Sequence, residues 1–254
     1  MKNKQYKFGL KKSKIEPHEH FVSFNYEKID IPNKCNLKHR VKQIYDQKNM
    51  NACSANATAN LLSIVDKDNK LNCNISRMYL YFCTRWIDNN MILPVQDSGG
   101  TLKSTIDAIS RYRYVDEDKV YPYFEHLVND IPYKHVFEDA FKHKSPITSY
   151  RQIIPSKHAI KYILYKLEQS ILFGMSIYTN FLDITKENDI LGMPKTEDEF
   201  LGYHAVLIVG YDDETETFDI LNSHGSDWGD DGYFRMKYEY ILNHNLCFEF
   251  YCVQ

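Results

Sequence analysis

The amino-acid sequence predicts an α+β fold, with a helical first half followed by a strand-rich second half. In the first half the apolar residues recur at spacings of three and four, which is typical of amphipathic helices. From about residue 171 onward, short runs of β-branched and aromatic residues alternate with Gly, Asp and Asn turns, which indicates strands. A chain of 254 residues with 43% hydrophobic content can bury the core of one large domain or of two packed lobes.

Four helices are expected. The first covers residues 52–65, where Ala55, Ala59 and Leu62 recur at helical spacing and Asn51 is a plausible N-cap. Cys53 would therefore lie in the first turn of this helix. The other expected helices cover residues 75–86, 101–111 and 156–170.

Strands are expected over residues 174–179, 205–211, 217–222, 232–236 and 248–253. Residues 1 to about 45 show little periodicity and contain the breakers Pro17 and Pro32, so they are expected to form an extended arm and a surface segment. We divide the chain into an N-terminal arm, residues 1–26, and one domain, residues 27–254. Within that domain the helical lobe spans about 50–150 and the β lobe about 151–254.

Composition argues against several classes of protein. A formal net charge of −3 gives no whole-chain electrostatic reason to expect nucleic acid as a partner. The chain has no apolar run long enough to span a membrane and no signal-peptide core at its start. Six cysteines without a CxxC pair fit neither a disulfide scaffold nor a zinc site, so we expect buried thiols, with the exception of Cys53.

Cys53 is the candidate nucleophile. A cysteine attacks a carbonyl as its thiolate, and the dipole at the first turn of a helix stabilises that negative charge. The thiolate needs an imidazole that pairs with it and later protonates the leaving amine. Among ten histidines, His204 is the candidate because it directly precedes the apolar run 205–211, at the mouth of an expected buried strand.

Asn222 and Gln47 are candidates for two supporting roles. Asn222 ends the next expected strand, and its amide oxygen would hold the His204 ring in one tautomer if the two strands are antiparallel neighbours. Gln47 precedes Cys53 by six positions, so its amide and the Cys53 backbone N–H would together stabilise an oxyanion. Taken singly, each residue fits a structural role better than a catalytic one: Cys53 as a core thiol, His204 as a buried histidine, and Asn222 or Gln47 as a turn or surface residue. Their joint occurrence is what predicts a cysteine peptidase.

Over residues 44–253 the sequence resembles the papain-like, cathepsin-type cysteine peptidases, the bacterial and viral members more than animal cathepsins. The spacing from Gln47 to Cys53 matches the family, and the Ser-Gly-Gly at 98–100 resembles its Asn-Gly-Gly substrate-backbone site. The Tyr-His-Ala-Val at 203–206 resembles the strand of the family's histidine. The most specific match is 222–233, which resembles the Asn-Ser-Trp-Gly block and keeps its second Trp-Gly, at Trp228.

This resemblance implies a papain-like, two-lobed fold, with a helical lobe packed on an antiparallel, β-barrel-like lobe and the active site in the cleft between them. It implies an endopeptidase that acts on peptide or protein substrates through a Cys53 acyl-enzyme, without a cofactor or a metal. His204 would be the acid and base, Asn222 the orienting group and Gln47 the oxyanion donor. The residues expected to bind substrate are Gly99, Gly100, His224 and Trp228.

Three departures from the family pattern are informative. Met50 and Asp97 stand where the family has the two halves of a disulfide, and losing both together fits a reducing compartment: the cytoplasm, or a virion if the source is viral. His224 stands where the family has a tryptophan that shields the histidine–asparagine hydrogen bond. His224 would either stack on the catalytic ring, or titrate and make the activity pH-dependent, or act only as structural filler.

The N-terminal arm has a possible inhibitory role, and two alternative functions stay open. The arm 1–26 is a candidate short prosegment that lies across the cleft, with His18 and His20 as a blocking or metal-like patch, or as solvated residues. One alternative is a catalytically impaired papain-fold protein that binds a peptide or partner, because His224 and Ser54 replace tryptophans of the family pattern. The other is a Cys–His acyl transferase or ligase. We expect the chain to be a monomer.

Overall fold

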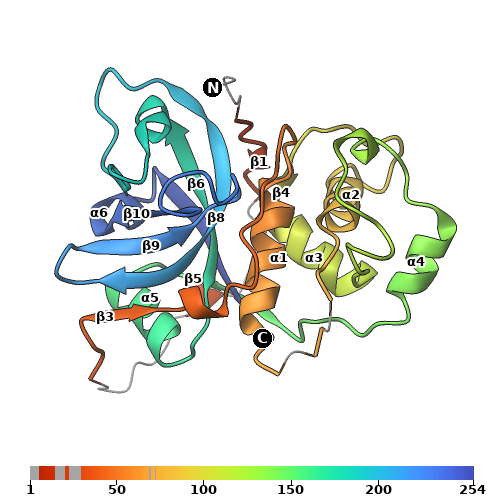
Figure 1. Ribbon diagram of the computed structural model, residues 1–254, viewed down its shortest axis with the longest axis horizontal. Helices are drawn as coiled ribbons and strands as arrows, with labels where there is room; N and C mark the ends of the chain where they lie inside the picture. The colour runs from red at the N-terminus through yellow and green to blue at the C-terminus, as the bar shows by residue number, and fades with distance from the viewer. Residues whose placement is uncertain (1–5, 15–20, 23–29, 69, 72) are drawn as a thin grey trace.

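Two lobes, one helical and one built on a sheet, make up the protein. A computed structural model describes residues 6–14, 21–22, 30–68, 70–71 and 73–254. The helical lobe and the sheet lobe lie side by side, with helix α1 (Cys53–Val65) between them (Figure 1). This is the two-lobed α+β arrangement expected from the sequence. No helix in these described ranges is long and apolar enough to cross a membrane.

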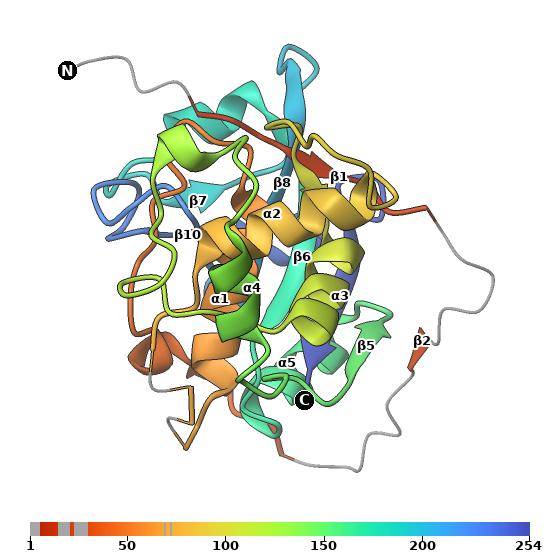
Figure 2. The ribbon, with the colours of Figure 1, turned by 90° about the vertical axis from the view of Figure 1, so that its right-hand side faces the viewer.

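Helix α1 is the central element of the helical lobe. Eleven of its 13 residues are buried, and its small side chains Ala55, Ala57 and Ala59 allow close approach on all sides. Figure 2 shows the helices of this lobe in front of the sheet. The further helices are α2 (Arg77–Asp88), α3 (Leu102–Tyr112) and α4 (Lys134–Ala140), with a 3₁₀ turn at Glu125–Leu127.

One mixed sheet forms the second lobe. Its described strands run in the order β2-β5-β11-β6-β8-β9-β10-β7, and β3 pairs with β8. The central pairs β6–β8 and β8–β9 are antiparallel, and most of their buried residues are apolar, with His204 of β8 among the polar exceptions. The strands are β2 (Phe21–Val22), β3 (Lys34–Asn36), β5 (Tyr150–Ile153), β6 (Ile171–Tyr178), β7 (Ile190–Leu191), β8 (Phe200–Asp212), β9 (Thr217–Leu221), β10 (Tyr233–Lys237) and β11 (Cys247–Val253). Helices α5 (Lys157–Tyr165) and α6 (Tyr238–Ile241) and the 3₁₀ turns Lys38–Arg40 and Thr179–Asp183 complete this lobe.

A two-stranded pair lies between the lobes. Strand β1 (Leu10–Lys11), near the start of the chain, pairs in parallel with β4 (Gly100–Thr101) of the helical lobe. The neighbouring Gly9 forms a bridge with Tyr203 of β8, on the sheet side. Figures 1 and 2 both show β1 at the junction of the two lobes. The start of the chain therefore contacts both halves of the molecule.

Several element boundaries differ from the predicted ones. Ala52 caps α1, so the prediction of Asn51 as its N-cap was wrong; the Asn51 amide instead donates to the Asp97 carbonyl, at 2.9 Å. The helix predicted over 156–170 ends at Tyr165, because the chain turns at Glu168, which has a positive φ of 52°. His204 lies inside β8 and not at its mouth, because the strand begins at Phe200 through pairing with β6.

The cysteines are all free thiols. Cys83, Cys247 and Cys252 are buried, as expected of core thiols, and Cys53, which that expectation did not include, is buried as well. Cys35 and Cys73 are only half-buried, which corrects the expectation that every cysteine other than Cys53 is a core residue.

Candidate active site

Cys53 is the first residue of α1 and is completely buried. The backbone amides of Ala205 and Gly9 lie close enough to its sulfur to lower the pKa of the thiol, so the thiol lies beside the residue that follows His204 in β8. Burial acts in the opposite direction and is the larger effect, and it raises the pKa of the Cys53 thiol to about 11. In this closed arrangement the cysteine is a neutral thiol near pH 7.

His204 and Asn222 form a buried pair. The antiparallel pairing of β8 with β9 brings Asn222, which directly follows β9, next to His204. His204 Nε2 lies 2.7 Å from Asn222 Oδ1. Burial lowers the pKa of His204 to about 4, while the hydrogen bond with Asn222 raises it. His204 Nδ1 has no hydrogen-bond partner within the described ranges, so this nitrogen can accept a proton.

The Asn222 side chain uses both ends of its amide. Its Oδ1 also accepts the backbone N–H of Ser223, at 2.8 Å. Its Nδ2 lies 3.0 Å from Nδ1 of His224. All four residues of this cluster, His204, Asn222, Ser223 and His224, are at most 2% exposed. The orientation of the amide is therefore held from both sides.

Gln47 joins the same cluster from the segment before α1. Its backbone N–H donates to the Ser223 carbonyl at 2.8 Å, and its Oε1 accepts the Ser223 hydroxyl at 2.7 Å. Its Nε2 donates to the Met50 carbonyl at 2.9 Å and to the Lys7 carbonyl at 3.0 Å. The amide predicted to stabilise an oxyanion therefore binds a carbonyl oxygen of the chain's own N-terminal part.

That N-terminal part, which we call the covering segment (residues 6–14), passes directly over Cys53. Besides the contacts of Lys7 with Gln47 and of Gly9 with the sulfur, the Gly9 carbonyl accepts the N–H of Gly100, at 3.1 Å. A Cβ on Gly99 would collide with the Gly9 backbone, and Gly99 has a φ of 76°. Gly99 and Gly100 thus hold an extended backbone segment of the same chain, and their binding of substrate stays a prediction.

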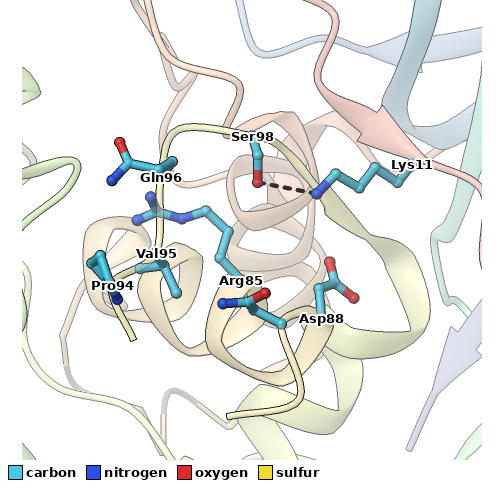
Figure 3. A pocket seen from close by; sticks show the side chains of 8 residues that line it. Lys11, Arg85, Asp88, Pro94, Val95, Gln96 and Ser98 are labelled. Carbon is cyan, nitrogen blue, oxygen red and sulfur yellow. Dashed lines mark hydrogen bonds between the residues drawn. The ribbon is translucent and has the colours of Figure 1, made fainter. Parts of the chain in front are cut away.

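Polar contacts fix the edges of the covering segment. The Lys7 ammonium pairs with Asp97 at 3.0 Å, and the Ser13 hydroxyl donates to Glu249 at 2.6 Å. The Lys11 ammonium donates to the Ser98 hydroxyl at 3.0 Å, at the wall of a cavity of about 260 Å³ (Figure 3). The predicted patch at His18 and His20 lies outside the described residues.

His224 and Trp228 belong to an aromatic cluster beside Asn222. The His224 ring stacks on Tyr6 of the covering segment, with ring centroids 4.3 Å apart. Trp228 is only 7% exposed and packs against Phe181 and Phe234. His224 contacts the covering segment directly, whereas Trp228 supports the His224 ring edge-on, with centroids 5.4 Å apart.

Sequence reasoning missed two residues that shape this site. Ser223 connects Gln47 to Asn222, and its place as the serine of the Asn-Ser-Trp-Gly block was the available signal. Asp97 accepts the Asn51 backbone N–H at 2.9 Å and the Tyr81 hydroxyl at 2.7 Å. These hydrogen bonds tie the Cys53 segment to the glycine pair, where the family resemblance implies a disulfide. The sequence signal for Asp97 was that it stands where the family pattern has one half of a disulfide.

Comparison with known proteins identifies the family. The family model described as "Papain family cysteine protease" matches residues 27–248. The chain belongs to this family. It is a hydrolase of the cysteine protease class with the papain-like fold, and it is closer to bacterial and viral members than to animal ones.

Individual relatives agree with that assignment. The chain is 28% identical to the crystal structure of xylellain, a cysteine protease from Xylella fastidiosa, with a TM-score of 0.83 over 97% of this chain and 95% of that one. It is 27% identical to an uncharacterised peptidase C1-like protein of Acanthamoeba polyphaga mimivirus, over 97% of this chain and 86% of the relative. Procathepsin B from Trypanosoma congolense shares the fold at a TM-score of 0.70, with 18% identity over 97% of this chain and 86% of that one.

Proposed function

We propose that this papain-family protease is an endopeptidase that cleaves through a Cys53 acyl-enzyme, and that residues 6–14 hold it in a latent form. The observation that supports this most is the buried hydrogen-bonded cluster of Gln47, Ser223, Asn222 and His204 beside the Cys53 sulfur. Such a cluster leaves one nitrogen of His204 available to the thiol and fixes the other.

The chemical steps follow from these positions. The Cys53 thiol transfers its proton to His204 Nδ1, and the thiolate attacks the carbonyl carbon of the scissile peptide bond. The oxyanion receives hydrogen bonds from Gln47 Nε2 and the Cys53 backbone N–H, and His204 then protonates the leaving amine. Water, deprotonated by His204, hydrolyses the resulting thioester and regenerates the thiol.

Latency has a specific basis in the contacts of the covering segment. The Lys7 carbonyl accepts a hydrogen bond from Gln47 Nε2, and the Gly9 backbone amide lies close to the Cys53 sulfur, so backbone of the covering segment occupies both the oxyanion site and the space beside the nucleophile. Burial in this arrangement keeps Cys53 and His204 neutral, with pKa values of about 11 and about 4. A substrate can react only after residues 6–14 move away. We further propose a reducing compartment, since hydrogen bonds of Asp97 replace the family's disulfide.

Covalent labelling tests the proposal. An epoxysuccinyl peptide inhibitor is incubated with the full chain, with a variant whose covering segment is weakened (Lys7→Ala with Ser13→Ala), and with Cys53→Ala. We expect an adduct on Cys53 that forms faster in the weakened variant and is absent in Cys53→Ala. Absence of any adduct in a folded, weakened variant would overturn the endopeptidase assignment, and product mass spectrometry would distinguish hydrolysis from transfer to an amine.

A further inference from the structure

The hydrogen bonds around Asn222 carry information about where the protons lie. We infer that His224 is a positioning residue that must stay neutral, with its proton on Nε2, for Asn222 to hold His204. The protonation pattern rests on hydrogen-bond geometry alone, whereas its consequence for catalysis rests on the proposed function.

The backbone of Ser223 fixes the orientation of the Asn222 amide. A backbone N–H can only donate, so the Asn222 atom that lies 2.8 Å from Ser223 N must be the oxygen. The opposite orientation would place an NH₂ group against this N–H in a fully buried site, at the full cost of an unsatisfied donor. The oxygen of Asn222 is therefore shared by Ser223 and His204, and the NH₂ group points to His224.

The protons on both imidazoles follow. His204 Nε2 faces an oxygen at 2.7 Å, so it carries a proton and donates it. His224 Nδ1 faces an NH₂ group at 3.0 Å, so it must accept and cannot carry a proton. A neutral His224 therefore has its proton on Nε2. The two histidines become the ends of one chain of hydrogen bonds in which Asn222 is the middle member.

Protonation of His224 would break this chain. An Nδ1–H would face the Asn222 NH₂ group, so two donors would oppose each other and the amide would rotate away from His204. The new charge would also lie beside the His204 ring, whose centroid is 5.1 Å from that of His224. During the reaction His204 is itself a cation, and two like charges at this separation disfavour each other.

The surroundings of His224 determine how it responds to pH. Among the described residues, the titratable groups on neighbouring elements include the Tyr6 phenol of the covering segment, the His204 imidazole of β8, and the carboxylate of Asp46, whose backbone bridges to His224. The described rings of Phe8, Phe181 and Trp228 also lie near His224 and are not titratable. The tryptophan that the family pattern places at position 224 could not respond in this way, because indole neither accepts a hydrogen bond nor titrates.

Nitrogen NMR of the full chain tests the inference directly. The histidines are labelled with ¹⁵N, and long-range spectra report which ring nitrogen carries a proton; the variant His224→Asn assigns the His224 signal. At pH 7.5 we expect a proton on Nε2 alone for His224 and a protonated Nε2 for His204. As the pH falls, the His204 signal should shift at the same pH at which His224 takes up its second proton. A proton on His224 Nδ1 at pH 7.5, or no response of His204 to that titration, would overturn the inference.

Two variants separate positioning from packing. In His224→Asn a side-chain oxygen that cannot titrate replaces Nδ1, so the bond from Asn222 is retained and the coupled shift of His204 should vanish. His224→Phe keeps a ring but removes the acceptor, and we expect kcat/KM about tenfold below that of His224→Asn at pH 7.5, the scale of one buried hydrogen bond. Equal kcat/KM in the two variants would contradict a positioning role. A failure of peptide hydrolysis would leave the NMR result intact, so it would count only against the proposed function.

Discussion

The catalytic cluster and the covering segment lie in contact, but they are held in different ways. The bonds among Gln47, Ser223, Asn222 and His204 are all buried and come from side chains fixed by strands or by backbone pairing. The edge contacts of the covering segment involve partly exposed groups, such as Lys7, which is 42% exposed. Exposed ion pairs are worth little, whereas buried, fully paired networks are costly to disturb. The comparison indicates that the catalytic cluster keeps its geometry when the covering segment moves away.

Removal of the nucleophile should have the largest effect. In a variant with a weakened covering segment, we expect Cys53→Ala to lower kcat/KM by more than about 10⁴-fold, since nothing else supplies the thioester. The matched control is Cys83→Ala, which removes another buried thiol, in α2. Peptide hydrolysis assays check this, and equal losses in both variants would mean that Cys53 has no special role.

Loss of the oxyanion donor should come next. Gln47→Glu keeps the size of the side chain but replaces the Nε2 donor with an oxygen, so kcat should fall by about 10²- to 10³-fold. Gln152→Glu in β5 is the control, because β11 and β6 separate that strand from β8, which carries His204. Steady-state kinetics separate kcat from KM, and a change confined to KM would show that Gln47 binds substrate without stabilising the transition state.

Weakening the contacts of the covering segment should have a smaller effect of opposite sign, an increase in the reactivity of Cys53. Lys7→Ala combined with Ser13→Ala removes the ion pair with Asp97 and the hydroxyl bond to Glu249, although the Ser13 backbone N–H still donates to Glu249 at 2.7 Å, and the rate of Cys53 labelling should rise by about tenfold. Lys134→Ala, which removes an exposed lysine paired with Glu138 in α4, should leave the rate unchanged. An unchanged labelling rate in the double variant would show that these contacts do not keep the segment in place.

The smallest effect concerns pH. Burial lowers the pKa of His204 to about 4, so the covered form is fully stable above the ordinary imidazole pKa of about 6.5 and loses stability as the pH falls toward 4. We expect hydrogen exchange at the Gly100 N–H, corrected for its intrinsic rate, to accelerate by about threefold from pH 7 to pH 6. His204→Asn should abolish this dependence and His224→Asn should retain it. Unchanged exchange in the wild type would mean that His204 stays buried when the segment opens.

The sequence was sufficient to predict the overall architecture and the residues that meet in the site. The spacing of Gln47 and Cys53 and the strand patterns around His204 and Asn222 place these residues in one cluster, because local motifs at strand and helix ends determine their positions. The catalytic roles of these residues stay predictions. The start of β8 was predicted incorrectly, because pairing with β6, and not apolar periodicity, orders residues 200–204.

Two features could not be read from the sequence. The covering segment has only two residues in β1 and no periodicity, so its position depends on pairing with β4, about 90 residues later. The link from Asn222 to His224 depends on which way an amide is turned, and the backbone N–H of Ser223 determines that. Both features arise from contacts between distant or freely rotating groups, for which sequence pattern carries no signal.

The covalent attachment of the covering segment has a kinetic consequence. A tethered segment competes with substrate at an effective concentration of about millimolar, so weak contacts are enough to keep it in place. If the segment were separated from the rest of the chain, it would compete with substrate only at its bulk concentration. Its release would then depend on dilution as well as on the strength of its contacts, so weak contacts that suffice for a tethered segment would no longer hold it.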